Sequence, residues 1–362
     1  MGFGGAERGV AMLVASLADR GHEVALIAPH GALDEDLRDV AHLRFESDDH
    51  GRRGVGAMRS AVQVASAIRR VRPDVIHAQN VKATVIARAG KAMAIQRDRP
   101  ALLATFHGVL ASEYPSAARL LRAADHVACV STDLLEGIAA AGLPRRRASL
   151  IRNAVALPAP LSTTRRAALD GEFGLTDAPV ITIAGRLVPQ KAHERFVVAA
   201  RRIVDEMPDV RLLIVGEGPR KDEIERLLLT AELGDRVRLT GGRSDAREIL
   251  ARSDVVVFSS SWEGLSIAAL EALAAGTPVV STDVQGMHEL LIGGAGAVVP
   301  LDDGTALGER ILTLLRDPTE HERMGRAGRA LIENDYSLER MVDAYESVYE
   351  LLADGASGVR SA

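Results

Sequence analysis

Short apolar runs alternate along the whole chain with longer segments of helical periodicity. The longer segments, such as 57–72 and 116–124, repeat apolar positions at the three- to four-residue spacing of a helix. Runs rich in valine and isoleucine between such helices are typical of parallel strands that are covered on both faces. The pattern therefore predicts strands at 23–29, 74–79, 102–108, 126–131, 149–155, 180–185, 211–216, 236–241, 254–260, 278–283 and 296–301.

Two doubly wound domains follow from this pattern and from the length of 362 residues. Prolines and polar residues interrupt the alternation at 156–177, so we expect the interdomain connection there. The predicted domains are 1–155 and 178–334, and 335–352 is predicted to be an amphipathic final helix. The chain starts inside a glycine-rich turn, where such a domain normally has a strand first. We therefore expect the first strand of the N-terminal domain to be missing.

Composition narrows the classes of protein that fit. Aromatic residues make up only 3%, which argues against base-stacking nucleic-acid modules. No apolar run approaches the roughly 18 residues of a membrane span. The single cysteine, Cys129, lies in an apolar run and predicts a buried thiol in a reducing cytoplasm.

Charge divides unevenly between the two halves. Residues 1–155 hold 21 Lys and Arg against 16 Asp and Glu, whereas the remainder holds 23 against 33. Within 50–112, eleven basic residues are opposed only by Asp74 and Asp98. This basic stretch has two interpretations: solvated faces of the helices at 57–72 and 82–97, or a patch that meets anionic lipid.

The segment 259–283 contains two glutamates eight residues apart, Glu263 and Glu271, around a helix that is predicted to begin near Ser266. A helix start offers free backbone N–H groups and a partial positive charge, which suit a phosphate. One carboxylate would then accept hydrogen bonds from a sugar and the other from ribose hydroxyls. A capped surface helix whose glutamates face water is the plainer interpretation.

A pair of cations follows the strand at 180–185. Arg186 comes directly after it, and Lys191 stands near the start of the next helix. Open α/β sheets bind ligands at the carboxyl ends of their strands. Arginine binds phosphate through its planar guanidinium and lysine acts as a point charge, so this pair would neutralise a diphosphate leaving group without a metal. The plainer alternative is a helix start whose charges are solvated.

Taken in order, these motifs resemble the retaining glycosyltransferases of family four, which have the two-domain GT-B architecture. The resemblance rests on GGAER, RGHEV, DVIH, FHG and RNAV in the first half, and on GRLVPQK, VGEGP, LTG and the glutamate pair in the second. It covers essentially the whole chain apart from the missing strand. It implies two Rossmann-like domains facing a central cleft, with the acceptor in the first domain, the nucleotide sugar in the second, and the final helix crossing back onto the first.

The resemblance also implies roles for individual residues. Glu271 would bind the ribose, Glu263 the transferred sugar, and Arg186 with Lys191 the diphosphate. His107 would face the transferred sugar from the first domain. Gly4 and Gly5 would let the backbone approach the phosphates or acceptor, and the amides of Ser266 and Ile267 would contact the diphosphate. The stretch Arg238–Gly241, which includes Leu239, would lie against the base mostly through backbone contacts, and Leu265 would also belong to the donor pocket.

Departures from the family pattern are few. Ala192 and Ala154 stand where the family often has glycine, and Gln79 and Gln285 replace a histidine and a glycine. Alanine costs little unless the backbone needs a positive φ, so we expect small effects.

Three other motifs carry less weight. Asp34-Glu35-Asp36 matches an Asp-x-Asp metal motif but is better explained by a helix start. The turn at 215–219 lacks the third glycine of a dinucleotide fingerprint. His77 and His126 have no metal-ligand spacing and are expected to be ordinary core or surface residues.

We therefore predict a cytoplasmic, metal-independent, retaining hexosyltransferase without a cofactor, acting in glycan, glycolipid or polysaccharide biosynthesis. It would move a sugar from a UDP or GDP sugar to a hydroxyl acceptor, often lipid-linked in this family, and would not bind nucleic acid. Peripheral contact with the inner face of the cell membrane is a further hypothesis. The alternatives are a non-catalytic sugar-nucleotide-binding protein and a GT-B nucleotide-sugar epimerase.

Overall fold

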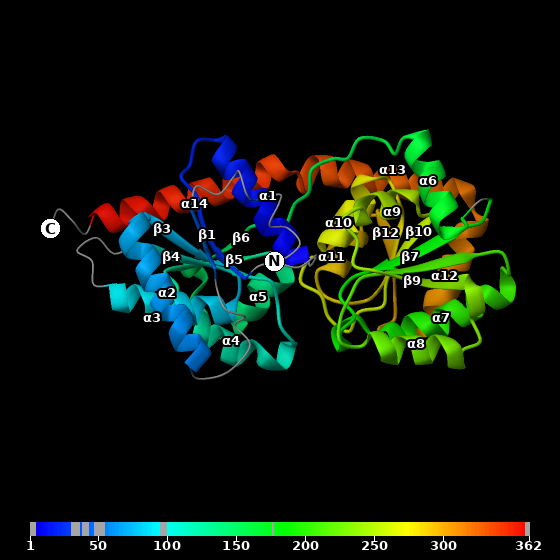
Figure 1. Cartoon of the computed structure of the whole chain (residues 1–362), viewed down its shortest axis with the longest axis horizontal. Coiled ribbons are helices and arrows are strands. Elements are labelled where there is room, and N and C mark those ends of the chain that lie inside the picture. Colours follow the sequence, from blue (N-terminus) through cyan, green and yellow to red (C-terminus); the bar gives the residue numbers. More distant parts are fainter. Residues whose placement is uncertain are drawn as a thin grey trace. The chain divides into compact units, whose positions relative to one another are not determined.

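The computed structural model describes residues 5–29, 37, 43–46, 55–94, 100–175 and 177–358. The chain divides into two compact units (Figure 1). Unit 1 combines Ala6–Asn153 with the C-terminal part from Leu338, and unit 2 comprises Ala154–Ser337. Each unit has the alternation of strands and helices that the hydrophobic pattern predicts.

Unit 2 is built on one parallel sheet of six strands in the order β12-β11-β10-β7-β8-β9. All five pairings are parallel, and β7 and β10 at the centre are buried along their whole lengths. The elements are α6 (Thr163–Phe173), β7 (Val180–Ala184), α7 (His193–Glu206), β8 (Arg211–Val215), α8 (Lys221–Thr230), β9 (Val237–Gly241), α9 (Ala246–Arg252), β10 (Val255–Phe258), α10 (Ile267–Ala274), β11 (Val279–Thr282), α11 (Met287–Leu291), β12 (Gly296–Val299), α12 (Gly304–Arg316) and α13 (Pro318–Asp335).

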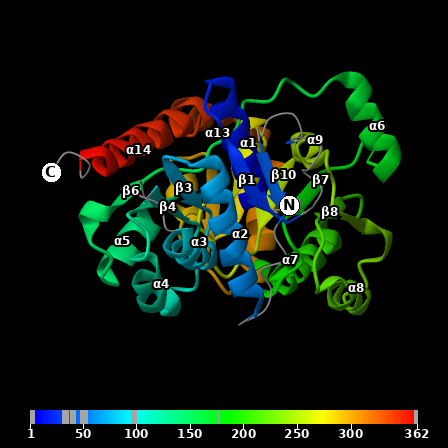
Figure 2. The ribbon, with the colours of Figure 1, turned by 60° about the vertical axis from the view of Figure 1, so that its left-hand side comes forward.

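The described strands of unit 1 form two parallel sheets, β1-β2 and β3-β4-β5-β6. Ile27 of β1 and Ile76 of β3 pack against the same cluster of apolar residues from α2 and α3, two helices that lie side by side (Figure 2). The elements are α1 (Gly5–Asp19), β1 (Ala25–Ala28), β2 (Leu43–Glu46), α2 (Val55–Val71), β3 (Val75–Ala78), α3 (Val81–Ala94), β4 (Ala101–Phe106), α4 (Tyr114–Leu121), β5 (His126–Cys129), α5 (Thr132–Ala140), β6 (Ala148–Leu150) and α14 (Leu338–Gly358).

The predicted doubly wound fold is confirmed, since a strand overlaps each of the predicted apolar runs. One strand, β2, was not predicted because its sequence LRFE holds only two apolar residues between charged ones. Cys129 is fully buried, as predicted, and burial raises the pKa of its thiol to about 12.

The segment 156–177, for which we expected only a connection between domains, contains α6. The Ser162 side chain caps the start of this helix by accepting a hydrogen bond from the Arg165 amide, and Gly174 ends it in the left-handed conformation. Leu169 and Phe173 are buried one turn apart. The surrounding prolines and polar residues hid these helix signals in the sequence.

The final helix, α14, belongs to unit 1 and contacts β3 and β4. His77 of β3 lies at the centre of this contact. Its Nδ1 and Nε2 atoms form hydrogen bonds of 2.8 Å with the Tyr349 hydroxyl and 2.7 Å with the Thr105 hydroxyl. Thr105 is also joined to the Tyr345 hydroxyl at 3.0 Å. Burial, helped by the nearby His107, lowers the pKa of His77 to about 3.

This low pKa predicts that unit 1 loses stability in mild acid. Because unfolded histidine titrates near pH 6.5, the unfolded chain binds more protons than the native chain below that pH. His77 should therefore cost about 1.4 kcal/mol of unfolding free energy per pH unit as the pH falls from 6.5 toward 3. Urea unfolding at several pH values, followed by circular dichroism, should show a shallower pH dependence for His77→Gln. Equal slopes in the two proteins would contradict the prediction. Fluorescence of Trp262, the only tryptophan and a residue of unit 2, provides the internal control.

Candidate donor-binding site in unit 2

The candidate site lies where the strand order of unit 2 reverses. The chain passes from β7 through β8 to β9 on one side, and then starts again at β10 on the other side of β7. The carboxyl ends of β7 and β10 are therefore neighbours at the switch point, which is where open α/β sheets bind ligands. Arg186 and Lys191 follow β7, and Glu263 follows β10.

Lys191 and Glu263 form a direct ion pair at this point. The Lys191 side chain is 14% exposed and the Glu263 side chain only 6%. Ser260 donates a 2.6 Å hydrogen bond to the same carboxylate oxygen that Lys191 contacts. Two charges buried to this degree are stabilised by each other, and an incoming ligand that displaced one of them would have to replace its charge.

Three hydrogen bonds join the two loops that carry this pair. The Ser261 amide donates to the Gln190 carbonyl at 2.8 Å, and the Gln190 side chain donates to the Trp262 carbonyl at 3.0 Å. The Ser259 hydroxyl donates to the Lys191 carbonyl at 2.8 Å. The site is therefore fixed before any ligand binds.

The VGEGP motif at 215–219 holds the segment that carries Arg186 through backbone hydrogen bonds. The likeness of this motif to a dinucleotide-binding turn does not suggest such a role. The amides of Gly185 and Leu187 donate to the carbonyls of Val215 and Glu217 at 2.9 and 2.8 Å. A Cβ atom at Gly216 would lie 1.9 Å from the Gly185 carbonyl oxygen, so only glycine allows this approach. The Arg186 side chain itself is exposed.

The second glutamate lies on α10, whose N-cap is Ser266 and whose first residue is Ile267. Glu271 is buried, with its side chain 5% exposed, and its Oε1 atom lies 3.6 Å from the Arg247 Nε. The interpretation of both glutamates as water-facing residues of a surface helix is therefore wrong. The interval between them is also not wholly helical, because Glu263 precedes the helix start.

A residue that sequence reasoning missed, Gly286, holds the loop between the two glutamates. It has φ 60° and ψ −44°, a conformation that disfavours side chains. A Cβ atom there would lie 1.4 Å from the Gly264 carbonyl oxygen and 3.4 Å from the Leu265 amide nitrogen. The surviving glycine of the family's Gly-Gly pair, next to Gln285, was the available signal.

Our expectation that alanine in place of the family's glycine has only a small effect is wrong at Ala192. It has φ 43° and ψ 54°, which is the left-handed conformation, between the 3₁₀ turn Pro189–Lys191 and α7. An alanine in this conformation costs roughly 1–2 kcal/mol. The turn imposes it because the chain must reverse from the Lys191 loop into the helix. Ala154 is not among the residues with positive φ.

The remaining residues predicted for the donor pocket have varied environments. Leu239 is half-buried in β9, and Leu265 is buried. The Arg238 side chain turns toward α6, where it lies 5.3 Å from the centre of the Phe173 ring and donates to the Glu172 carbonyl.

His107 belongs to unit 1, where it follows β4 and precedes Gly108, which has φ 98°. Its Nε2 atom is buried without a hydrogen-bond partner among the described residues. Burial lowers the pKa of His107 to about 4, so the ring is neutral at pH 7. A neutral ring with an unpaired nitrogen suits a hydrogen bond to a hydroxyl group.

Two predicted features lie wholly or partly outside the described residues. Gly5 begins α1, whereas Gly4 and the segment Asp34-Glu35-Asp36 are not described. Over the described ranges, the structure has no group of three or more His, Cys, Asp or Glu side chains that could hold a metal ion. The same ranges contain no helix with the length and apolar character needed to cross a membrane.

Two family models match the chain, glycosyltransferase family 4 over residues 3–157 and glycosyl transferases group 1 over residues 167–331. The lipopolysaccharide core biosynthesis glycosyltransferase LpsE of Rhizobium meliloti is 29% identical over 94% of each chain. The GDP-mannose-dependent monoacylated alpha-(1-6)-phosphatidylinositol monomannoside mannosyltransferase of Corynebacterium glutamicum is 32% identical over 54% of this chain and 52% of its own length.

Among solved structures, Anabaena HepE in complex with UDP and glucose superposes with a TM-score of 0.83, at 21% identity and over 96% of each chain. This likeness shows that the two units have the fold of GT-B proteins. The boundary between the two family models falls between β6, the last strand of unit 1, and β7, the first strand of unit 2. The chain belongs to the GT-B glycosyltransferases of family four, with a group 1 domain in its second half.

Proposed function

We propose that this glycosyltransferase moves a hexose from a UDP or GDP sugar to a hydroxyl group of a glycan or lipid-linked acceptor, with retention of configuration and without a metal ion. Unit 2 would bind the nucleotide sugar and unit 1 the acceptor. The observation that carries the proposal is the Lys191–Glu263 pair at the switch point of unit 2, with the buried Glu271 eight residues further on.

In this proposal the diphosphate of the donor replaces Glu263 as the anion that Lys191 contacts. Lys191, Arg186 and the amides at the start of α10 would stabilise the negative charge that develops on the diphosphate as the sugar leaves. Glu263, released from Lys191, would accept hydrogen bonds from the sugar hydroxyls. Cationic side chains and helix amides then do the work that a metal ion does in other transferases, which supports metal independence.

Glu271 would bind the ribose, Leu239 would lie beside the base, and Leu265 would line the donor pocket. The names of relatives support both kinds of donor, since HepE was solved with UDP and the Corynebacterium enzyme is named as GDP-mannose-dependent. The buried, neutral His107 of unit 1 would donate or accept one hydrogen bond at the transferred sugar. It would act by binding rather than as a general acid, because its low pKa keeps it unprotonated near pH 7.

The test is a calorimetric screen of UDP, GDP and their sugars in the presence of a metal chelator, followed by assays of donor consumption with and without added acceptor sugars. We expect one nucleoside diphosphate to bind, and its sugar to be consumed only when an acceptor is present. Binding without any turnover would favour the sugar-nucleotide-binding protein. Isomerisation of the donor without an acceptor would favour the epimerase.

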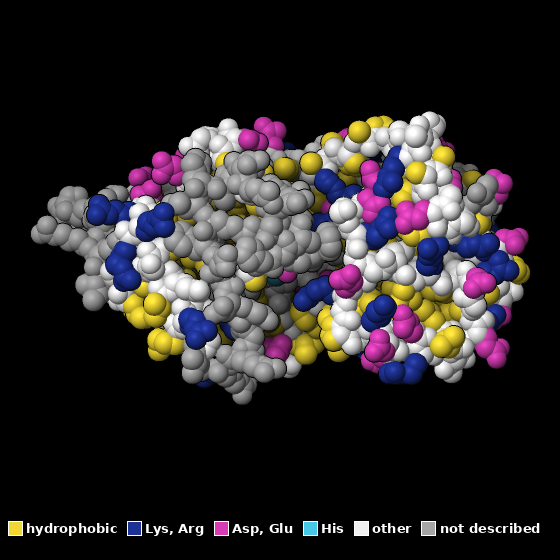
Figure 3. Space-filling view, in the orientation of Figure 1, with side chains coloured by type: hydrophobic (Ala, Val, Ile, Leu, Met, Phe, Trp, Pro, Cys, Tyr) yellow, Lys and Arg dark blue, Asp and Glu magenta, His cyan; other side chains and the backbone are white. Residues whose placement is uncertain are grey.

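Peripheral membrane contact is a further part of the proposal. The basic residues Arg59, Arg69, Arg72, Lys82 and Arg88 are all exposed on or beside α2 and α3. Exposed apolar side chains lie on the same helices, including Met58, which is 62% exposed. Figure 3 shows Lys and Arg side chains over the part of unit 1 that carries these helices, whereas both signs mix over unit 2. Basic and apolar side chains together suit a surface of anionic lipid.

We expect the protein to sediment with phosphatidylcholine vesicles that contain phosphatidylglycerol, at low salt, but not with pure phosphatidylcholine. Each surface charge contributes about 1 kcal/mol, so Arg69→Glu with Arg72→Glu should reduce binding at least tenfold. The matched control reverses Arg323 and Arg326 on α13 of unit 2 and should bind as the wild type does. Equal sedimentation of all three proteins would exclude the α2–α3 surface.

A further inference from the structure

A cation faces the buried carboxylate of Glu271 that the proposed function assigns to the ribose. The Arg247 Nε lies 3.6 Å from the Glu271 Oε1. The Glu271 side chain is 5% exposed, whereas the Arg247 side chain is 43% exposed. Burying a carboxylate is costly unless a positive charge lies nearby, and the Arg247 guanidinium supplies one beside Glu271.

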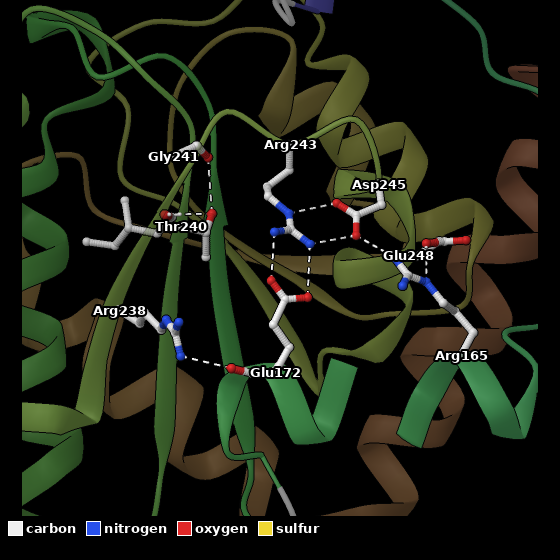
Figure 4. Close-up of polar contacts among 9 residues, drawn as sticks. Arg165, Glu172, Arg238, Thr240, Gly241, Arg243, Asp245 and Glu248 are labelled. Carbon is white, nitrogen blue, oxygen red and sulfur yellow. Dashed lines mark hydrogen bonds and ion pairs between the residues drawn. The ribbon is translucent and has the colours of Figure 1, made fainter. Parts of the chain in front are cut away.

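Arg247 is the second residue of α9, and a cluster of ion pairs holds the start of this short helix. Asp245 immediately precedes α9. Arg243 donates two hydrogen bonds of 2.8 Å to the Asp245 carboxylate and two more, of 2.7 and 3.1 Å, to the Glu172 carboxylate of α6 (Figure 4). The bonds from Arg243 hold the pKa of Asp245 below its usual range, so this carboxylate is charged at neutral pH.

A second arginine connects α6 to the same helix. Arg165 contacts the Asp245 carboxylate and donates a 2.6 Å hydrogen bond to Glu248, one turn further along α9 (Figure 4). These pairs are partly exposed, and each contributes little to stability by itself. Together they fix the position of α9, because two arginines from different segments contact the start of this seven-residue helix.

We propose that Arg247 is a positioning residue for ribose recognition, and that Arg165 of α6 keeps α9 where Arg247 can face Glu271. This inference rests on the proposed function of unit 2. Arg247 orients the carboxylate as an acceptor for the ribose hydroxyls. Lys191 and Arg186 bind the other end of the donor, so Arg247 acts on recognition of the ribose and not of the diphosphate.

The experiment compares the affinities of UDP, 2′-deoxy-UDP and UMP by calorimetry, or of the guanosine compounds if the screen selects GDP. A hydrogen bond to a charged group corresponds to roughly tenfold or more in affinity, so the wild type should prefer UDP over 2′-deoxy-UDP by that factor. In Arg247→Gln this preference should fall at least threefold, while the preference for UDP over UMP stays unchanged. Arg165→Gln should shift the preference in the same direction by a smaller factor.

Two further variants separate positioning from a general loss of structure. Arg247→Lys restores the charge and should recover part of the preference for ribose. Arg326→Gln removes an exposed i,i+4 pair with Glu322 on α13 and should match the wild type. An equal loss of affinity for UDP, 2′-deoxy-UDP and UMP in Arg247→Gln would assign Arg247 a merely structural role and overturn the inference.

Lys191→Ala distinguishes failure of the inference from failure of the proposed function. If Lys191→Ala weakens UDP binding and Arg247→Gln leaves the preference for ribose intact, the positioning role is wrong and the donor site stands. If neither UDP nor GDP binds the wild type, or Lys191→Ala binds as tightly as the wild type, both proposals fall.

Discussion

Lys191→Ala is expected to weaken binding of the donor nucleotide at least about 30-fold, because truncating one member of a buried charge pair costs about 2–5 kcal/mol or more. The loss has two sources. The diphosphate loses its point charge, and Glu263, which is 6% exposed, remains as an unpaired buried carboxylate. The same change should lower the unfolding free energy of unit 2 by about 3–5 kcal/mol. Calorimetry with UDP and GDP measures the first effect, and urea unfolding followed by Trp262 fluorescence measures the second.

A double variant separates the two effects. Lys191→Ala with Glu263→Gln removes both charges, so most of the lost stability should return while the nucleotide still binds weakly. Lys221→Ala is the matched control, because the one ion pair that this lysine forms with described residues is an exposed pair of 3.8 Å with Glu225. Tight nucleotide binding by the double variant would show that Lys191 does not contact the diphosphate.

Gly286→Ala is expected to lower the unfolding free energy of unit 2 by roughly 3 kcal/mol or more, through backbone strain and overpacking together. The new Cβ atom would lie 1.4 Å from the Gly264 carbonyl oxygen, and a carbonyl in this loop can yield only if the Glu263–Ser266 segment moves. The variant should therefore also bind the donor nucleotide at least tenfold more weakly, in proportion to the displacement of Glu263 from the site.

Gly293→Ala provides the control for this prediction. Gly293 lies seven residues further along, and a Cβ atom there would meet no atom within 4 Å. Its unfolding free energy should stay within about 0.5 kcal/mol of the wild type. If Gly286→Ala matches Gly293→Ala in both stability and nucleotide affinity, the close approach of Gly286 to the Glu263–Ser266 segment is needed for neither folding nor donor binding.

The sequence was sufficient for the central strands of unit 2 because β7 and β10 are short, nearly continuous apolar runs. A run such as VITIA at 180–184 is buried on both faces of a parallel sheet, so burial alone dictates its composition. Arg186 and Lys191 could be predicted as a pair for a similar reason. They follow one strand directly, and local order along the chain places both at its carboxyl end.

Contacts between distant segments were decided only by the tertiary structure. Lys191 meets Glu263 because β7 and β10 are neighbours in the sheet, although 72 residues separate the two side chains. Gly286 touches Gly264, and Arg165 of α6 grips Asp245, through packing that leaves no periodic trace in the sequence. Residue types and local spacing record what a segment must bury, whereas the choice of partner depends on strand order and on backbone approach, which arise only when the chain folds.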